Sequence, residues 1–204
     1  MADAPLPAPM ILTSPARGRS RSARLVAFII ILGLVIALPL LTTLRGCDDK
    51  VNANVQSVKI GGEWFHLEVA AEDAVRMKGL GQRDHIEPDG GMLFVFTRPN
   101  SADGGFVMRD CPIPIDIIFL DASGRIDPDW HTMTAERPRG EGEGKLGDYD
   151  NKTYEGRLPK YGPRYPYQFA IELKGGTIDS KLKGRLKAGD KVEMPIEALK
   201  KRAK

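Results

Sequence analysis

The residue whose surroundings most constrain its chemistry is Asp116, which interrupts the apolar run from Ile113 to Leu120. A carboxylate in such a run must find a cation or several N–H donors, because an unpaired buried charge costs several kcal/mol. Arg76 and Arg83 are the partners that we expect. Two interpretations stay open: the carboxylate fixes a helix and a loop to a sheet, or it belongs to a polar site. In that site an arginine would hold an anionic or polyhydroxyl ligand that Asp116 and Asp110 orient.

A second group of candidate residues lies in a long loop insertion, residues 132–165, which is rich in glycine, proline and charged residues. All five tyrosines of the chain fall within this loop or directly after it. Long loops in compact domains are usually functional or disordered. The loop is therefore expected either to fold over one open end of a barrel or to bind a glycan or protein partner. In the second case Tyr154, Tyr161 and Tyr165 would stack on sugar rings or form an interface.

Metal binding and nucleophilic catalysis find little support in the residue spacing. Asp127, Asp129 and His131 alternate and would share one face of a strand, but the proline between the aspartates weakens that assumption. A polar outer face is expected there, and no metal. Cys111 would need a positioned base to act as a nucleophile, and no histidine lies near it in the sequence, which favours a small buried thiol. We assign no catalytic residue and expect no cofactor.

The elements that position these residues are mostly strands. Val58–Ile60 and Glu63–Ala70 flank two glycines and predict a hairpin, because glycine readily takes the positive φ of tight turns. Residues Glu72–Lys78 predict one short helix, ended by Gly79. Further strands are expected at Met92–Phe96, Ile113–Leu120, Phe169–Leu173 and Lys191–Ile196. Short strands separated by turns predict a mainly β domain, either a sandwich or a barrel.

Blocks of residues between Leu67 and Asp190 follow one another in a specific order and spacing. They are Leu67–Ala70, Arg76 with Gly79, Leu80 and Arg83, Gly90–Phe96, Phe106 with Met108, Ile115–Asp121 with Gly124 and Ile126, Ile171–Leu173 with Gly175, and Gly189-Asp190. In this order they resemble the domain of unknown function 192 family, DUF192, over about residues 58–196. The resemblance implies a mainly antiparallel β fold of jelly-roll type, often exported or tethered in prokaryotes, and no established activity.

The sequence departs from the pattern of that family at three places. Gly81-Gln82 replace bulkier residues, Asp110-Cys111 replace a polar pair usually of Asn-Thr type, and residues 132–165 are expanded. If the common blocks line a site, these departures change its details.

The uncharged run from Leu25 to Leu44 predicts where the rest of the chain lies. About 20 apolar residues cross a bilayer as a helix, and arginines hold the flank on the cytoplasmic side. Four arginines precede the run, so we expect a single-pass protein of the cell membrane with its folded domain in the periplasm or outside the cell. The expected divisions are a basic cytoplasmic tail (1–24), a transmembrane helix or signal anchor (25–44), a linker (45–57), the β domain (58–196) and a basic tail (197–204).

Cys47 leaves a second interpretation of the anchor open. The segment Leu44–Cys47 resembles a bacterial lipoprotein cleavage box, in which Cys47 would carry the lipid. Arg45 fits such a box poorly, and the apolar run is longer than an ordinary signal, which favours the uncleaved helix. Cys47 and Cys111 are the two cysteines of the chain, one beside the membrane and one in a core-like segment, so a disulfide between them is not expected.

The charge distribution excludes one class of partner. The chain carries a net charge of +3, and residues 1–24 alone account for all of it, so the remainder is neutral. A nucleic-acid surface is therefore not expected. The basic residues at 197–204 are expected to form a solvated, disordered tail.

Two classes of function remain. The first is a non-enzymatic, membrane-tethered β domain that binds a ligand or partner at the cell envelope, such as a glycan or an envelope protein, because no nucleophile, phosphate loop or metal cluster is evident. The alternative is a hydrolase of envelope polysaccharide with carboxylates near Asp116 as acid and base. It is motivated by location, fold analogy and the tyrosine-rich loop.

Overall fold

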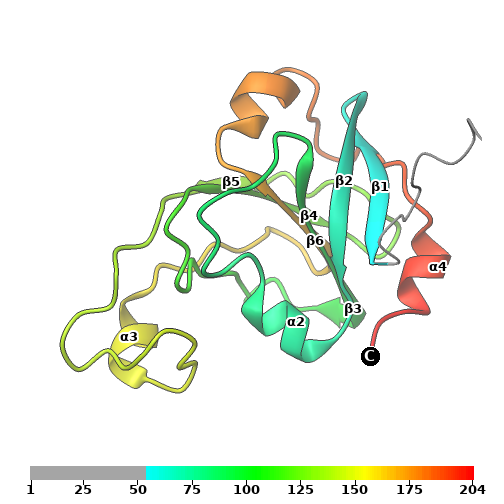
Figure 1. Cartoon of the computed structure of the whole chain (residues 1–204). Helices are drawn as coiled ribbons and strands as arrows, with labels where there is room; N and C mark the ends of the chain where they lie inside the picture. The colour runs from blue at the N-terminus through cyan, green and yellow to red at the C-terminus, as the bar shows by residue number, and fades with distance from the viewer. Residues whose placement is uncertain (1–53) are drawn as a thin grey trace, which may run out of the picture. The chain divides into compact units, whose positions relative to one another are not determined.

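A glycine pair makes the first turn of the domain, which a computed structural model describes over residues 54–204 (Figure 1). Strands β1 (Val55–Ile60) and β2 (Glu63–Ala70) pair antiparallel around Gly61 and Gly62, whose φ angles are 56° and 89°. The predicted hairpin is confirmed, because both turn residues take the positive φ that glycine tolerates. Residues 55–57, expected in the linker, already belong to β1.

Within residues 54–204 the sheet contains six strands, in the order β1-β2-β3-β6-β4-β5. The other four strands are β3 (Gly90–Asn100), β4 (Ile115–Leu120), β5 (His131–Met133) and β6 (Tyr167–Lys174). Strands β2 and β3 run parallel, and all other neighbours run antiparallel. The expectation of an antiparallel fold is therefore corrected to a mixed sheet. Parallel neighbours need a crossover longer than a hairpin turn, and residues 71–89 supply it.

The expected second sheet or closed barrel is absent from residues 54–204. Strands β1 and β5 form the two edges of the one sheet. The segment predicted as a strand at Lys191–Ile196 makes only isolated bridges, Lys59 with Glu193 and Arg125 with Lys191. Pro195 has no N–H to donate to a strand ladder, and a helix begins at the next residue.

Short helices cover the sheet. The predicted helix is confirmed as α2 (Asp73–Lys78), which ends at Gly79 with φ 53°. Two helices, α3 (Lys152–Arg157) and α4 (Ile196–Lys200), and a π-helical turn, η1 (Ile178–Leu182), were not predicted.

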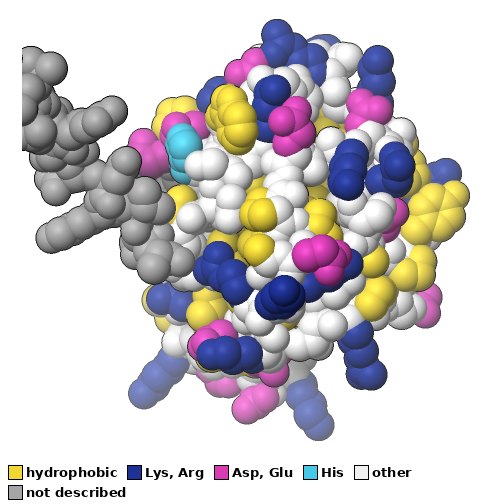
Figure 2. All heavy atoms as spheres, turned by 90° about the vertical axis from the view of Figure 1, so that its right-hand side faces the viewer, with side chains coloured by type: hydrophobic (Ala, Val, Ile, Leu, Met, Phe, Trp, Pro, Cys, Tyr) yellow, Lys and Arg dark blue, Asp and Glu magenta, His cyan; other side chains and the backbone are white. Residues whose placement is uncertain are grey.

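The basic segment at 197–204 packs against the domain, contrary to the disordered tail expected from its charge. Leu199 of α4 is buried, and the N–H of Lys204 donates to the oxygen of Ala71. Figure 2 shows the α4 side with lysine and arginine side chains interspersed with acidic ones. Examples are Lys200 with Glu197 and Lys204 with Glu72. These ion pairs explain why the basic segment 197–204 can pack against the domain despite its positive charge.

Both faces of the sheet are buried, because alternate side chains of the central strands point to opposite sides. One apolar cluster contains Leu93, Ile118 and Ile171 and is covered by Leu182 of η1 and Leu199 of α4. The other contains Met92, Ile117 and Ala170 and packs against Val75 of α2 and the partly buried Phe106. The second face holds the candidate site.

Within residues 54–204, no helix is both long enough and apolar enough to cross a membrane. The predicted transmembrane helix at 25–44 and the lipoprotein cysteine, Cys47, lie outside the described residues.

Candidate functional site

Glu172 is a buried acid in the centre of the sheet. It lies on β6 between Met92 of β3 and Ile117 of β4, and only 5% of its surface is exposed to solvent. Strand β3 can pass this close because position 91 is glycine: a Cβ there would lie 2.1 Å from the backbone oxygen of Glu172. The side chain points to the face that α2 covers, where Gly79 leaves room beside its Oε2 atom.

Burial raises the pKa of Glu172 to about 8, against the opposing effects of the Leu80 N–H and of Arg83. Removal from water disfavours the charged carboxylate, so the neutral acid persists at pH 7. A neutral carboxyl group can both donate and accept a hydrogen bond. The Leu80 N–H donates to this carboxyl group, and within residues 54–204 no side chain accepts a hydrogen bond from it.

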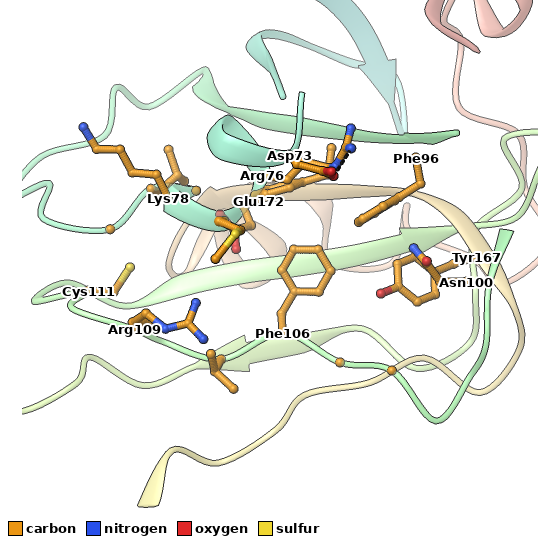
Figure 3. Close-up of a pocket in the computed structure, with 18 of the residues that line it drawn as sticks. Asp73, Arg76, Lys78, Phe96, Asn100, Phe106, Arg109, Cys111, Tyr167 and Glu172 are labelled. Carbon is orange, nitrogen blue, oxygen red and sulfur yellow. Dashed lines mark hydrogen bonds and ion pairs between the residues drawn. The ribbon is translucent and has the colours of Figure 1, made fainter. Parts of the chain in front are cut away.

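A pocket opens in front of Glu172, between α2 and residues 104–111, with a cavity volume of about 560 Å³. We call it the Glu172 pocket. Figure 3 shows Phe106 in its middle, with Cys111 and Tyr167 toward opposite ends. The Phe106 ring packs edge-on against Phe94, with ring centres 4.9 Å apart. The volume is typical of small-molecule sites, and the lining combines aromatic rings with charged and polar side chains.

The rim of the Glu172 pocket is cationic. Arg76 donates to the oxygen of Val95 at 2.8 Å and to the carboxylate of Asp73 at 2.5 Å. Arg109 donates from Nε and one Nη to Glu155, at 2.6 and 2.5 Å. Its other Nη has no partner within residues 54–204, and the side chain reaches into the pocket (Figure 3). These ion pairs fix both guanidinium groups in place.

Cys111 also lines the Glu172 pocket, as a neutral thiol. Burial, together with smaller effects of the nearby Glu172 and Asp110 side chains, raises the pKa of Cys111 to about 12. A thiol with a raised pKa is a poor nucleophile, since the thiolate is the reactive form.

Of the residues predicted from sequence, Arg76 alone lines the Glu172 pocket, although Arg83 lies close enough to influence Glu172. Arg83 pairs with Glu68, with a contact of 2.8 Å between Nη2 and Oε2. Neither arginine contacts Asp116, so the predicted partnership is wrong. Asp116 is fully buried and accepts hydrogen bonds from the Thr132 hydroxyl and the Ile178 N–H, at 2.8 and 2.7 Å.

Asp116→Asn is expected to lower the free energy of unfolding by about 1–3 kcal/mol, because an amide has one acceptor oxygen and cannot accept both hydrogen bonds. Ligand binding in the Glu172 pocket should be unchanged, since Asp116 points to the opposite face, toward η1. Denaturant titration and a binding assay on the same preparation check both. Thr132→Val, which removes only one of the two donors, should give a smaller loss.

Asp110 and Tyr154 meet in a separate polar cluster that holds the long loop. Asp110 accepts from Arg139 at 2.7 and 3.0 Å and from the Gly147 N–H at 3.0 Å, and its own N–H donates to the Tyr154 hydroxyl. Burial raises the pKa of Asp110, but these hydrogen bonds outweigh it and leave the pKa below its usual value. Tyr154 is fully buried, with the Arg139 guanidinium 3.6 Å from its ring centre, so it has no free face for a sugar.

The other two tyrosines lie apart from this cluster. Tyr161 is half-buried, pairs through its backbone with Phe106 and packs its ring against His131. Tyr165 is 58% exposed and lines a different hollow, beside Asp127. The structure therefore does not bring Tyr154, Tyr161 and Tyr165 onto one surface.

The aspartates considered for metal binding are used in loop contacts. Asp127 accepts from the N–H groups of Asp129, Arg164 and Tyr165 at 2.9 Å, and His131 contacts the Gly162 oxygen. Among the residues that the structure describes, no group of three potential ligands is close enough to hold a metal ion.

Comparison with known proteins gives a family. The model of the DUF192 family, described as Uncharacterized ACR, matches residues 56–194. No curated protein matches the chain.

Two similar solved structures come from bacteria. One is a putative transcription regulator from Sinorhizobium meliloti 1021, at 23% identity and TM-score 0.47, covering 70% of this chain and 92% of that chain. The other is a protein of unknown function from Novosphingobium aromaticivorans DSM 12444, at 26% identity and TM-score 0.48, covering 68% and 83%.

Proposed function

The chain belongs to the DUF192 family, and we propose that its β domain is a membrane-tethered, extracytoplasmic module that binds a small ligand in the Glu172 pocket. The single observation that carries this proposal is the pocket itself. It combines aromatic walls with one buried, neutral carboxyl group that has no side-chain partner for its proton. A ligand in the pocket would accept the proton of this carboxyl group, in addition to the hydrogen bond that the Leu80 N–H already donates to it.

The tether is supported by the N-terminal sequence. The apolar run from Leu25 to Leu44 is long enough to span a bilayer, and the preceding arginines favour a cytoplasmic N-terminus. Residues 45–53 then connect the run to the first described residue, Asn54. A ligand-binding domain held there would meet compounds outside the cytoplasm.

The alternative hydrolase gains no support from the geometry. Asp116 lies beneath η1 on the face opposite the Glu172 pocket, and its two oxygens already accept hydrogen bonds. A general acid or base must reach the substrate directly or through one water. We therefore propose binding rather than polysaccharide cleavage.

The proposal is tested by thermal unfolding of the full-length protein in detergent, with a panel of small organic acids, amines, sugars and envelope glycans. A ligand that binds only the native state stabilises it, by about 2.7 kcal/mol at a concentration 100 times its Kd. Phe106→Leu, which keeps an apolar side chain but removes the ring in the middle of the pocket, should weaken that ligand at least tenfold.

Tyr165→Ala is the matched control, because it also removes an aromatic ring but lies outside the Glu172 pocket. It should leave the thermal shift unchanged. Equal shifts in wild type and Phe106→Leu, or a shift lost only in Tyr165→Ala, would place the binding site elsewhere. Absence of a shift with every compound would overturn the small-ligand proposal.

A further inference from the structure

The charges around the Glu172 pocket determine which ligand charge it favours. The cations of the lining are Arg76, Lys78 and Arg109, and the acid that lines it besides Glu172 is Asp73. Glu155 compensates Arg109 from outside the lining. When Glu172 is neutral, these three cations face two carboxylates, those of Asp73 and Glu155. The net positive charge favours an anionic ligand over a cationic one.

Two side chains that line the pocket offer hydrogen-bond donors. Glu172 is 5% exposed and offers the proton of its carboxyl group, and Arg109 offers the N–H groups of its unpartnered Nη. Both suit an acceptor with two oxygens, and a guanidinium binds such an acceptor more strongly than it binds a neutral one. An amine, by contrast, would find no ionised carboxylate free of an arginine among the described residues at the pocket, because Asp73 pairs with Arg76 and Glu155 with Arg109.

The aromatic walls define the other half of the ligand. Phe96 and Phe106 are only partly buried, and their rings stand edge to face, 6.5 Å apart. The Arg76 guanidinium already lies over Phe96, at 5.4 Å from the ring centre, which leaves less of that ring for a second cation. An apolar ring or chain can cover the remaining aromatic surface and gain from its removal from water.

We propose that the Glu172 pocket binds a small organic acid, with its apolar body against Phe96 and Phe106 and its carboxylate held by Glu172 and Arg109. This inference rests on the proposed function, because it names the ligand class of the same pocket. The carboxylate would accept the Glu172 proton in a hydrogen bond, so the complex requires the neutral form of Glu172. Ionised Glu172 would repel the ligand.

Binding should therefore depend on pH in a defined direction. Glu172 has its pKa raised to about 8, so a ligand that requires its neutral form loses affinity above that pH, by about tenfold per pH unit. The other groups facing Glu172 are Asp73, Arg76 and Lys78 from α2, Arg83 from the following loop, and Arg109 and Cys111 from residues 104–111. Glu172→Gln distinguishes the titration of Glu172 from that of these other groups, because glutamine stays neutral at every pH and still offers a hydrogen-bond donor. Any pH dependence that remains in this variant comes from the other groups.

The test compares three probes with the same aromatic body: phenylpropanoate, phenylpropanol and phenylpropylamine. Their affinities for the full-length protein in detergent are measured by calorimetry between about pH 6 and pH 10, two units either side of the expected pKa of about 8. Phenylpropanoate should bind at least tenfold more tightly than the other two at pH 7. Its affinity should fall above about pH 8 in wild type and stay level in Glu172→Gln.

Three outcomes would overturn the inference. These are tightest binding of phenylpropylamine, equal binding of acid and alcohol, or the same pH profile in wild type and Glu172→Gln. In the first two, loss of binding in Phe106→Leu would still support the pocket as the ligand site, so the proposed function would stand without the inference. If none of the probes binds, the inference fails, and the wider panel with Phe106→Leu decides the proposed function separately.

Discussion

Arg139→Ala is expected to lower the free energy of unfolding by about 3 kcal/mol, because it leaves the Asp110 carboxylate without its cation. The side chains of the two residues are 5% and 3% exposed, so water cannot replace the lost contact easily. Arg139 also donates to the backbone oxygens of Glu143 and Asp148 and covers the ring of Tyr154. Denaturant titration measures the loss, and limited proteolysis should show faster cleavage between residues 134 and 151.

Arg137→Ala is the matched control in the same loop. Its side chain is 56% exposed, and its partner Glu143 keeps Arg157 and the Gly140 N–H when Arg137 is removed. The expected loss is within about 1 kcal/mol, the usual range for an exposed ion pair. Similar losses in the two variants would show that the Asp110 cluster does not hold the loop.

Raising the pH should destabilise wild type far more than Glu172→Gln. Glu172 has a pKa of about 8 in the folded state against 4.5 as the reference value for the unfolded chain, so the folded state binds the extra proton between these pH values. The stability from its neutral form is fully present below pH 4.5 and is lost as pH rises through 8. The slope reaches about 1.4 kcal/mol per pH unit, and the total is on the order of 5 kcal/mol.

The measurement is the free energy of unfolding at pH 5, 7 and 9 for both proteins, spanning about two units on each side of neutrality. Glu68→Gln is the control that should leave the profile between pH 5 and pH 9 unchanged, because the hydrogen bond from Arg83 lowers the pKa of Glu68 below its reference value of 4.5. The stability that Glu68 contributes is present above its reference pKa of 4.5 and is lost as pH falls through the lowered value. Parallel pH profiles of wild type and Glu172→Gln would mean that Glu172 is hydrated and ionised in the fold.

Local sequence signals correctly predicted the first turn and the end of α2, which depend on only a few adjacent residues. The glycine pair between β1 and β2 and the glycine after α2 need a positive φ, and each marks a turn correctly. The alternation of apolar and polar residues is the same in parallel and antiparallel strands, so the parallel pairing of β2 with β3 was not predicted. The crossover at residues 71–89 was the available signal, because it is too long for a tight hairpin.

The site was harder to predict because its residues come from distant parts of the sequence. Asp116 and Glu172 give the same local signal, an acid within an apolar strand, and both are buried. Only the fold shows that Asp116 meets two donors beneath η1, whereas Glu172 faces a pocket. Arg139, the cation that pairs with Asp110, likewise lies 29 residues away in the sequence. It belongs to a loop, and a loop has no hydrophobic periodicity from which its position could be predicted.

The family resemblance, by contrast, was carried by residue order alone and is confirmed over residues 56–194. Several of its blocks surround the Glu172 pocket, including Gly79-Leu80, Phe94 with Phe96, and Phe106. The departures Gly81 and Cys111 also line it. At Gly81, a Cβ would lie 2.9 Å from the Lys78 oxygen and 3.0 Å from the Arg109 oxygen, so glycine permits the close approach of the two walls.

The most direct test of the account is a crystal structure of the full-length protein grown with the compound that gives the largest thermal shift. The account predicts that the compound lies between α2 and residues 104–111, in contact with the Phe106 ring and within hydrogen-bond distance of the Glu172 carboxyl group. A compound bound elsewhere, with the Glu172 pocket unchanged, would contradict the central claim that this pocket is the ligand site.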